Sequence, residues 1–170
     1  MKNLLWVLFF LPIVGFGQNV QKDSMLMPLL FDKVGIQKVI DVDSAKKNDL
    51  YIRAKLFFAE QFKSAKEVIQ LDDKEQGIIL GKGLTKISYW NIFSKTYEDL
   101  FFTLKFELKD YKFRYTISDI THSTYKFPVE MYWKNTGMTK KIRKAISESL
   151  QDLSNMIESE MKKPLNKDKW

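Results

Sequence analysis

Two consecutive stretches of the chain alternate between apolar and polar positions. Segment 102–109 has an aromatic or aliphatic residue at every even position, and segment 111–118 has one at every odd position. Successive side chains of a strand point to opposite faces of a sheet, so each stretch predicts a half-buried strand. A tight turn around Lys109 and Asp110 separates them, which predicts a β-hairpin.

Two other stretches have apolar residues at helical spacing. The segment 44–62 predicts a helix with Ser44 as its N-cap and with apolar positions Leu50, Ala54, Phe57, Phe58 and Phe62. Near the C-terminus a single apolar stripe steps by three or four residues, which predicts a long helix packed on the sheet. The stripe consists of Met138, Ile142, Ile146, Leu150, Leu153, Ile157 and Met161.

The remaining segments complete a single α+β domain. Ile36–Val42 is β-branched, Lys66–Asp73 is a short strand that enters a charged turn, and 77–90 has strand character. Residues 18–35 form a lead-in in which Pro28 argues against regular structure. At 170 residues the chain can bury one core, which we place at 36–161, followed by a basic tail at 162–170.

The stretch "EQGIILGKGLTK" (75–86) raises the possibility of a phosphate-binding loop. A P-loop needs four residues between its first glycine and the Gly-Lys pair, whereas three follow Gly77 here, and Gly83 stands where a Ser or Thr should be. The intervening Ile78, Ile79 and Leu80 favour a strand. We therefore interpret Gly81 and Gly83 as strand glycines at a bulge or sharp coil of a bent sheet.

The N-terminus has the three parts of an export signal. Lys2 is followed by the apolar run "LLWVLFFLPIV" (4–14) and by small residues at Gly15 and Gly17. The pattern predicts a signal peptide at 1–17 and a periplasmic or extracellular protein starting at Gln18. A membrane anchor is the alternative, although a spanning helix needs roughly 20 apolar residues. The chain has no cysteine, and loss of Lys2 changes its net charge from +7 to +6.

Isolated polar residues do not assemble a recognisable catalytic, cofactor or metal site. His122 is the only histidine, so a triad or a histidine-rich metal site cannot form within the chain. We interpret it as a strand-end or surface residue. Two groups of acids resemble calcium or acid-base clusters, but they lie where a strand meets a helix and in a turn. These groups are Asp41 with Asp43, and Asp72 with Asp73 and Glu75.

Four large rings in one loop form a first candidate binding surface. Tyr125, Phe127, Tyr132 and Trp133 lie between the hairpin and the C-terminal helix. They could line a ligand groove beside the sheet edge, or they could cap the core under the helix. We favour the cap and keep Tyr125 and Trp133 as candidate partner-binding residues.

The polar positions of the hairpin form a second candidate surface. Lys105, Lys109, Lys112 and Arg114 point away from the apolar set, together with Thr103 and Thr116, and Glu107 alone opposes them in charge. A solvated face that limits aggregation is one interpretation. The other is a surface for an anionic partner, for which Lys105, Lys112 and Arg114 are the candidates.

The chain resembles a known bacterial family. The motifs "LYIRAKLFFA", "VIQLDD", "GIILGKG" and "YKFRYTISDI" are similar to those of the DUF4468 family, a domain of unknown function described as TBP-like, over about Val39–Ile120. The resemblance implies a curved antiparallel sheet of about five strands with two helices on one face. It transfers no catalytic or binding residues, because a fold is not a function.

Two classes of function remain. The first is a non-catalytic envelope or secreted module that binds an unknown protein or anionic ligand on its sheet face, with no membrane span once the signal is removed. The second is a hydrolase that uses carboxylates alone on an envelope or extracellular polymer. The basic charge would also suit nucleic acid, but export argues against that partner. No cofactor is expected.

Overall fold

The predicted hairpin lies at the centre of the sheet. In a computed structural model that describes residues 27–29, 33–62, 68–134 and 137–165, β5 spans Lys95–Lys109 and β6 spans Lys112–His122. Leu104 pairs with Ile117 and Phe106 with Tyr115 in the antiparallel register. The even-numbered residues of β5 from Leu100 to Leu108, and Phe113, Tyr115 and Ile117 of β6, are buried on the same face, which confirms the predicted alternation there. Tyr111 was wrongly assigned to the strand, because it lies in the turn with a φ of 66° and is 50 % exposed.

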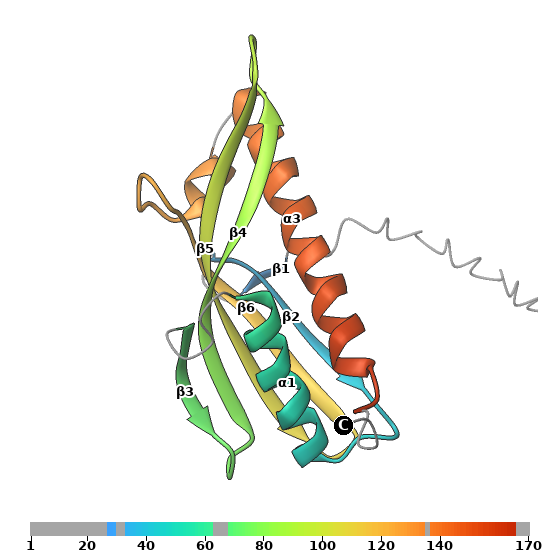
Figure 1. The fold of residues 1–170 in the computed structure, drawn as a ribbon. Helices are drawn as coiled ribbons and strands as arrows, with labels where there is room; N and C mark the ends of the chain where they lie inside the picture. The colour runs from blue at the N-terminus through green and yellow to red at the C-terminus, as the bar shows by residue number, and fades with distance from the viewer. Residues whose placement is uncertain (1–26, 30–32, 63–67, 135–136, 166–170) are drawn as a thin grey trace, which may run out of the picture.

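Six antiparallel strands form one curved sheet in the order β1-β2-β6-β5-β4-β3 (Figure 1). The outer strands are β1 (Met27–Leu29), β2 (Lys33–Asp41), β3 (Ile69–Asp73) and β4 (Ile78–Trp90). The five strands predicted from the sequence are present, and β1 is additional. The expectation that Pro28 excludes regular structure was wrong, because Pro28 pairs with Val34 on an edge strand, where a missing N–H is tolerated.

The domain is therefore slightly longer than predicted. β2 begins at Lys33 rather than Ile36, and the last helix ends at Lys162, so the lead-in and the tail each contribute to the body. The predicted signal peptide at 1–17 lies outside the described residues.

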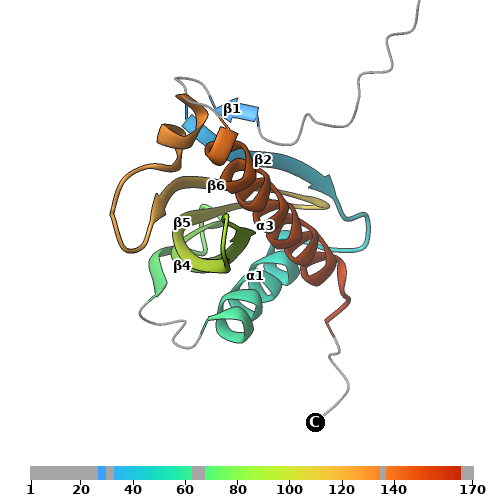
Figure 2. The ribbon, with the colours of Figure 1, turned by 90° about the horizontal axis from the view of Figure 1, so that it is seen from above.

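Two helices cover one face of the sheet, as expected. α1 spans Lys47–Gln61 and α3 spans Gly137–Lys162, and Figure 2 shows both on the concave side of the sheet. The predicted stripe of α3 is buried from Ile142 to Met161, whereas the side chain of Met138 lies outside the description. A helical face of this width buried against a sheet gives the domain its core.

The start of α1 differs from the prediction. The N-cap position is Lys46, and no side chain of the helix itself caps it, so Ser44 is not the N-cap. The carboxylate of Asp110, in the β5–β6 turn, instead accepts a hydrogen bond of 2.8 Å from the backbone N–H of Lys47. The cap thus comes from a residue distant in sequence, which local capping rules do not reveal.

The glycines of β4 have a packing role rather than a phosphate-binding one. Gly81 and Gly83 lie inside β4, and its pairing with β5 is continuous through them, so no bulge occurs there. A Cβ at Gly81 would lie 2.6 Å from Phe58 Cε1, and one at Gly83 would lie 2.3 Å from Phe102 Cζ. The irregularity falls on the neighbouring strand, between Ile69 and Leu71. Bare backbone is therefore required where aromatic rings press against the sheet.

Candidate functional site

The face of the sheet opposite the helices is open. Alternation sends Thr103, Lys105 and Glu107 of β5 to this face, while their neighbours are buried beneath α1 and α3. On β6 the corresponding residues are Lys112, Arg114 and Thr116. The structure therefore brings the predicted hairpin residues together on one surface, which we call the open face.

Glu107 neutralises part of the open face. It is the register partner of Arg114, whose Nε and Nη2 donate to its two carboxylate oxygens at 2.7 and 2.6 Å. Lys105 Nζ lies 3.4 Å from the same carboxylate. The hydrogen bond from Arg114, helped by the charge of Lys105, holds the pKa of Glu107 below its usual value. Lys105 and Arg114 are thus internally paired.

Two of the unpaired positive charges of the open face lie at the β5–β6 turn. Lys109 and Lys112 are directly opposite each other in the register, and both are exposed. Among the described residues neither forms an ion pair: Asp41, the register partner of Lys112 on β2, is not bonded to it, and Asp110 caps α1. Like charges facing each other across two strands destabilise a sheet unless something neutralises them.

A hollow of about 330 Å³ lies beside these two lysines. Its floor includes Val39, which is 60 % exposed, and Ile78 of β4. Lys109, Lys112 and Arg114 border it, together with Glu107, which is paired with Arg114. The hollow therefore combines an apolar floor with a basic rim, an arrangement that suits an anionic group carried on an apolar or extended ligand.

The rings of the aromatic loop range from exposed to partly buried. Tyr132 and Trp133 belong to the 3-10 helix η1 (Val129–Lys134) and pack against the core, which confirms the capping role for them. Burial, with the negative charge of Glu98, raises the pKa of Tyr132 to about 12. Tyr125 is 66 % exposed and lies parallel to Phe127, with ring centroids 5.8 Å apart. Phe127 also contacts Tyr132, with ring centroids 5.4 Å apart, so Tyr125, Phe127 and Tyr132 form one continuous group of rings that is exposed at Tyr125.

His122 lies at the end of β6, as predicted, but it is buried rather than superficial. Its Nε2 is 2.7 Å from Glu98 Oε2, and the other carboxylate oxygen of Glu98 accepts a hydrogen bond of 2.7 Å from Tyr89. Burial and Glu98 raise the pKa of Tyr89. Sequence reasoning missed Glu98 and Tyr89, although Glu98 falls in the apolar phase of β5 and could have been recognised as a buried acid.

Two of the acids, Asp72 and Asp73, have structural roles. Asp72 accepts hydrogen bonds from Tyr51 and Lys55, which lower its pKa, and the bond with Asp72 raises the pKa of Tyr51 to about 12. Asp73 accepts the backbone N–H of Gln76 in the β3–β4 turn. Asp41 and Asp43 lie at the end of β2 and in the turn after it. Within the described part of the chain, no group of three or more potential ligands could hold a metal ion.

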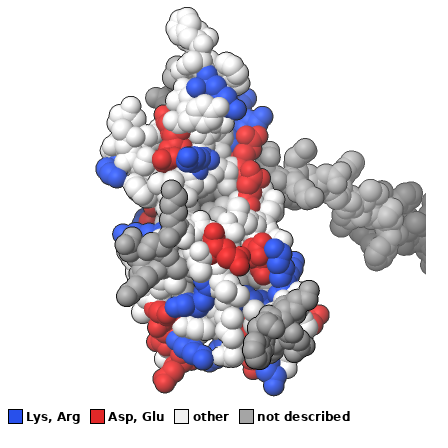
Figure 3. Space-filling view, viewed as in Figure 1, with Lys and Arg blue, Asp and Glu red and all other residues white. Residues whose placement is uncertain are grey.

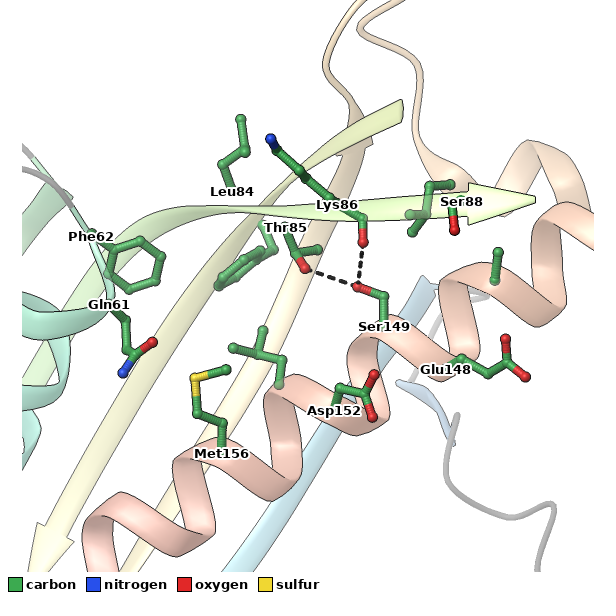
Figure 4. Close-up of a pocket in the computed structure, with 14 residues that line it drawn as sticks. Gln61, Phe62, Leu84, Thr85, Lys86, Ser88, Glu148, Ser149, Asp152 and Met156 are labelled. Carbon is green, nitrogen blue, oxygen red and sulfur yellow. Dashed lines mark hydrogen bonds between the residues drawn. The ribbon is translucent and has the colours of Figure 1, made fainter. Parts of the chain in front are cut away.

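A groove of about 430 Å³ separates β4 from α3 (Figure 4). Ser149 spans it, with its Oγ 2.9 Å from Thr85 Oγ1 and 3.2 Å from the carbonyl oxygen of Lys86. Glu148 and Asp152 both come from α3, on the same wall of the groove. A glycosidase needs two carboxylates flanking the scissile bond, and the described lining of this groove has no acid on the β4 side.

No described helix is long and apolar enough to cross a bilayer.

Comparison with known proteins settles the family. The model for "Domain of unknown function (DUF4468) with TBP-like fold" matches residues 37–123, which is half of the chain. The chain belongs to the DUF4468 family. The match includes the open-face strands β5 and β6, together with α1, β3 and β4.

Solved structures support the same fold. A DUF4468 family protein from Bacteroides ovatus has a TM-score of 0.68 at 14 % identity, covering 85 % of this chain and 95 % of its own. A TBP-like protein from Parabacteroides distasonis has a TM-score of 0.64 at 13 % identity, covering 81 % and 97 %. At this identity the likeness concerns fold alone. No curated protein matches the sequence.

Proposed function

We propose that this DUF4468 protein is an exported, non-catalytic module that binds an anionic partner in the hollow of its open face. The observation that carries the proposal is the facing pair Lys109 and Lys112, exposed and without an ion pair among the described residues. A bound anionic group between them would relieve their repulsion. The apolar floor formed by Val39 and Ile78 would add contact area.

Within the open face, we propose Lys109 and Lys112 as the centre of the binding site. Lys105 and Arg114 already share Glu107, so their replacement would also disturb the pair that stabilises the hairpin. Lys109 and Lys112 can instead be changed without breaking an ion pair in the part of the chain that the structure describes. They are the better test of binding. The positive charges of Lys105 and Arg114 add to the electrostatic attraction of an anionic partner.

Export of the protein supports an envelope or extracellular partner. The apolar run at 4–14 and the small residues Gly15 and Gly17 carry this part of the proposal. Anionic polymers and acidic proteins of the envelope would be attracted to a mature chain of charge +6.

Site-specific photo-crosslinking in the native cell tests the proposal. A photoreactive residue at Val39 would sit on the floor of the hollow, and one at Leu56, on α1, would serve as the off-site control. We expect a discrete adduct from position 39 alone, identified by mass spectrometry. The adduct should disappear in Lys109→Glu/Lys112→Glu and persist in Lys140→Glu/Lys141→Glu, which changes the net charge equally at exposed positions of α3.

Salt provides a second measurement. Binding of the captured partner to the purified protein should weaken as ionic strength rises above physiological, where the Debye length falls below about 8 Å. An adduct that survives in the folded Lys109→Glu/Lys112→Glu variant, or binding that is indifferent to salt, would contradict the proposal.

A further inference from the structure

The β4–β5 hairpin ends in a cluster of exposed apolar side chains. Trp90 is 63 % exposed, Ile92 is 78 % exposed and Phe93 is 92 % exposed, and Tyr97 follows on β5 with 69 %. Figure 1 shows the hairpin projecting beyond the start of α3, away from the rest of the body. We call Trp90, Ile92 and Phe93 the tip. Scattered apolar residues are ordinary on a surface, but three in four consecutive positions at a projecting end indicate an interaction site.

The turn that carries the tip satisfies three of its backbone N–H groups internally. The side-chain oxygen of Asn91 accepts hydrogen bonds of 2.8 Å from the backbone N–H groups of both Phe93 and Ser94. The backbone N–H of Asn91 donates to the carbonyl oxygen of Ser94 at 3.0 Å, and the Asn91 amide nitrogen donates to Thr96 at 3.1 Å. Polar groups satisfied internally can leave water at low cost, so this turn is suited to an apolar medium.

The surroundings of the tip are basic. Lys95 is the register partner of Trp90, and Lys86 lies four residues before Trp90 on β4. The first two turns of α3 carry Lys140, Lys141, Arg143 and Lys144 and no Asp or Glu. We call these six cations the collar. The neighbouring acids Glu98 and Asp99 lie opposite Ile87 and Lys86, and Glu98 is bonded to Tyr89 and His122. Figure 3 shows uncharged side chains at the projecting end, with Lys and Arg side chains directly below them.

The packing of α3 on β4 explains why the cations of α3 lie near the tip. Ser149 contacts Thr85 and Lys86, and the helix runs antiparallel to the strand in Figure 1. At about 1.5 Å per helical residue and about 3.3 Å per strand residue, Lys140 and Lys141 reach roughly the level of Trp90. The helix therefore brings Lys140 and Lys141, which are exposed, to about the level at which β4 ends.

We propose that the tip inserts into the surface of an anionic phospholipid bilayer, with the basic collar against the headgroups. Tryptophan and other large apolar side chains are favoured at the membrane interface, and nearby cations add attraction to acidic lipids. The tip is convex and only two strands wide, whereas a standard protein–protein interface buries about 800 Å² per partner. The tip can insert into a lipid surface without a pocket of complementary shape.

Vesicle binding tests the proposal with the chain that starts at Gln18, which contains every described residue and lacks the apolar run at 4–14. We expect co-sedimentation with vesicles of phosphatidylglycerol and phosphatidylcholine, and much weaker binding to phosphatidylcholine alone. Trp90→Ser/Ile92→Ser/Phe93→Ser should lower the affinity at least tenfold, since burial of even one such side chain is worth roughly a factor of ten.

Two control variants separate the tip from general effects. Val39→Ser/Leu56→Ser/Leu71→Ser removes three apolar side chains that are also exposed, at 60 %, 46 % and 48 %, but lie elsewhere. It should bind vesicles like the wild type. Lys109→Glu/Lys112→Glu changes the open face, and Lys140→Glu/Lys141→Glu changes the collar by the same charge. The first variant should keep a larger part of the affinity for anionic vesicles than the second.

Fluorescence gives a direct readout of insertion. With Trp133→Phe and Trp170→Phe in the chain from Gln18, Trp90 is the only tryptophan. Its emission should shift to the blue on anionic vesicles and be quenched by lipids brominated along their acyl chains.

Three outcomes would overturn the proposal: failure of the wild type to bind anionic vesicles, equal binding by the tip variant, or a Trp90 emission that vesicles leave unchanged. Self-association in analytical ultracentrifugation that the tip variant abolishes, without vesicle binding, would instead make the tip a contact between two copies.

Discussion

The hydroxyl oxygen of Tyr115 on β6 lies 2.6 Å from the hydroxyl oxygen of Ser154 on α3. Both residues are buried, and both approach the carboxylate of Glu158, to which Lys38 of β2 also donates at 2.8 Å. Four polar side chains from two strands and one helix therefore meet inside an otherwise apolar contact. Such a group fixes the position of α3 on the sheet more specifically than apolar packing alone can do.

We expect Tyr115→Phe to lower the free energy of unfolding by about 1–3 kcal/mol, because it leaves buried polar partners short of a hydrogen bond. Urea unfolding followed by circular dichroism measures the change. Tyr111→Phe, at a tyrosine that is 50 % exposed, is the control and should have little effect. A double-mutant cycle with Ser154→Ala should give a coupling between Tyr115 and Ser154; additive effects would refute the network.

Glu158 should contribute to the loss of stability in acid. Burial by itself would raise its pKa, but the hydrogen bonds from Lys38 and Tyr115 and the charges of Lys38 and Lys162 bring the pKa below its ordinary 4.5. A depressed pKa stabilises the folded state above about pH 4.5, and this contribution disappears as the pH falls through the folded-state pKa. The difference between the free energies of unfolding at neutral pH and below pH 4.5 should therefore be smaller in Glu158→Gln than in the wild type.

The same experiment needs a control for the other acids, because Glu107 and Asp72 also have lowered pKa values. Glu148→Gln, at an exposed position on α3, should keep the full acid sensitivity of the wild type. An acid sensitivity equal in all three proteins would show that Glu158 does not contribute.

Gly81→Val should destabilise the protein strongly, whereas Lys82→Ala should leave the melting temperature nearly unchanged. A Cβ at Gly81 would lie 2.6 Å from the ring of Phe58, and overpacking of this kind costs about 1–3 kcal/mol or more. Lys82 is exposed on the open face. Thermal unfolding by circular dichroism measures both. Saturable ATP binding that Lys82→Ala abolishes would revive the phosphate-loop interpretation.

The Gly81 prediction has an internal check. Gly81→Ala/Phe58→Leu should be more stable than Gly81→Ala alone, because the smaller side chain vacates the space that the new methyl group needs. If the second change brings no recovery, the requirement for glycine has another cause.

We expect the mature protein to begin at Gln18, because an apolar run of signal-peptide length precedes Gly15 and Gly17. Intact-mass measurement of protein isolated from native cells decides this, with allowance for cyclisation of the N-terminal glutamine. A mass that retains residues 1–17 would contradict both cleavage and release from the membrane.

Much of the fold could be predicted from local patterns. The alternation in β5 and β6 and the stripe of α3 are each produced by one buried face, and that face is visible in the sequence. The hairpin register was not predicted to the residue, because the turn lies at Asp110 and Tyr111 rather than at Lys109 and Asp110, and only this turn places Glu107 opposite Arg114. Strand β1 is three residues long and contains Pro28, so it leaves no periodic signal.

The features that the sequence could not predict depend on contacts between distant elements. The cap that Asp110 gives to α1, the groove between β4 and α3, and the burial of His122 beside Glu98 all depend on how elements cross. The sequence predicts which residues of the hairpin lie on its polar face, but it does not predict which of the lysines there remain without an ion pair. That depends on side-chain conformations across strands, and local propensity does not determine them.

The position of β2 in the sheet has a consequence for how the chain folds. Strands β3, β4, β5 and β6 follow one another as a meander of sequential neighbours, so their contacts are close in sequence and can form early. Residues 36–41 of β2 pair with residues 112–117 of β6, and this pairing must wait until the intervening chain has been made. During synthesis β2 therefore emerges long before its partner, and its apolar residues Val34 and Ile36 stay uncovered in the meantime. The growing chain is most vulnerable to aggregation during this interval, and the arrival of β6 ends it.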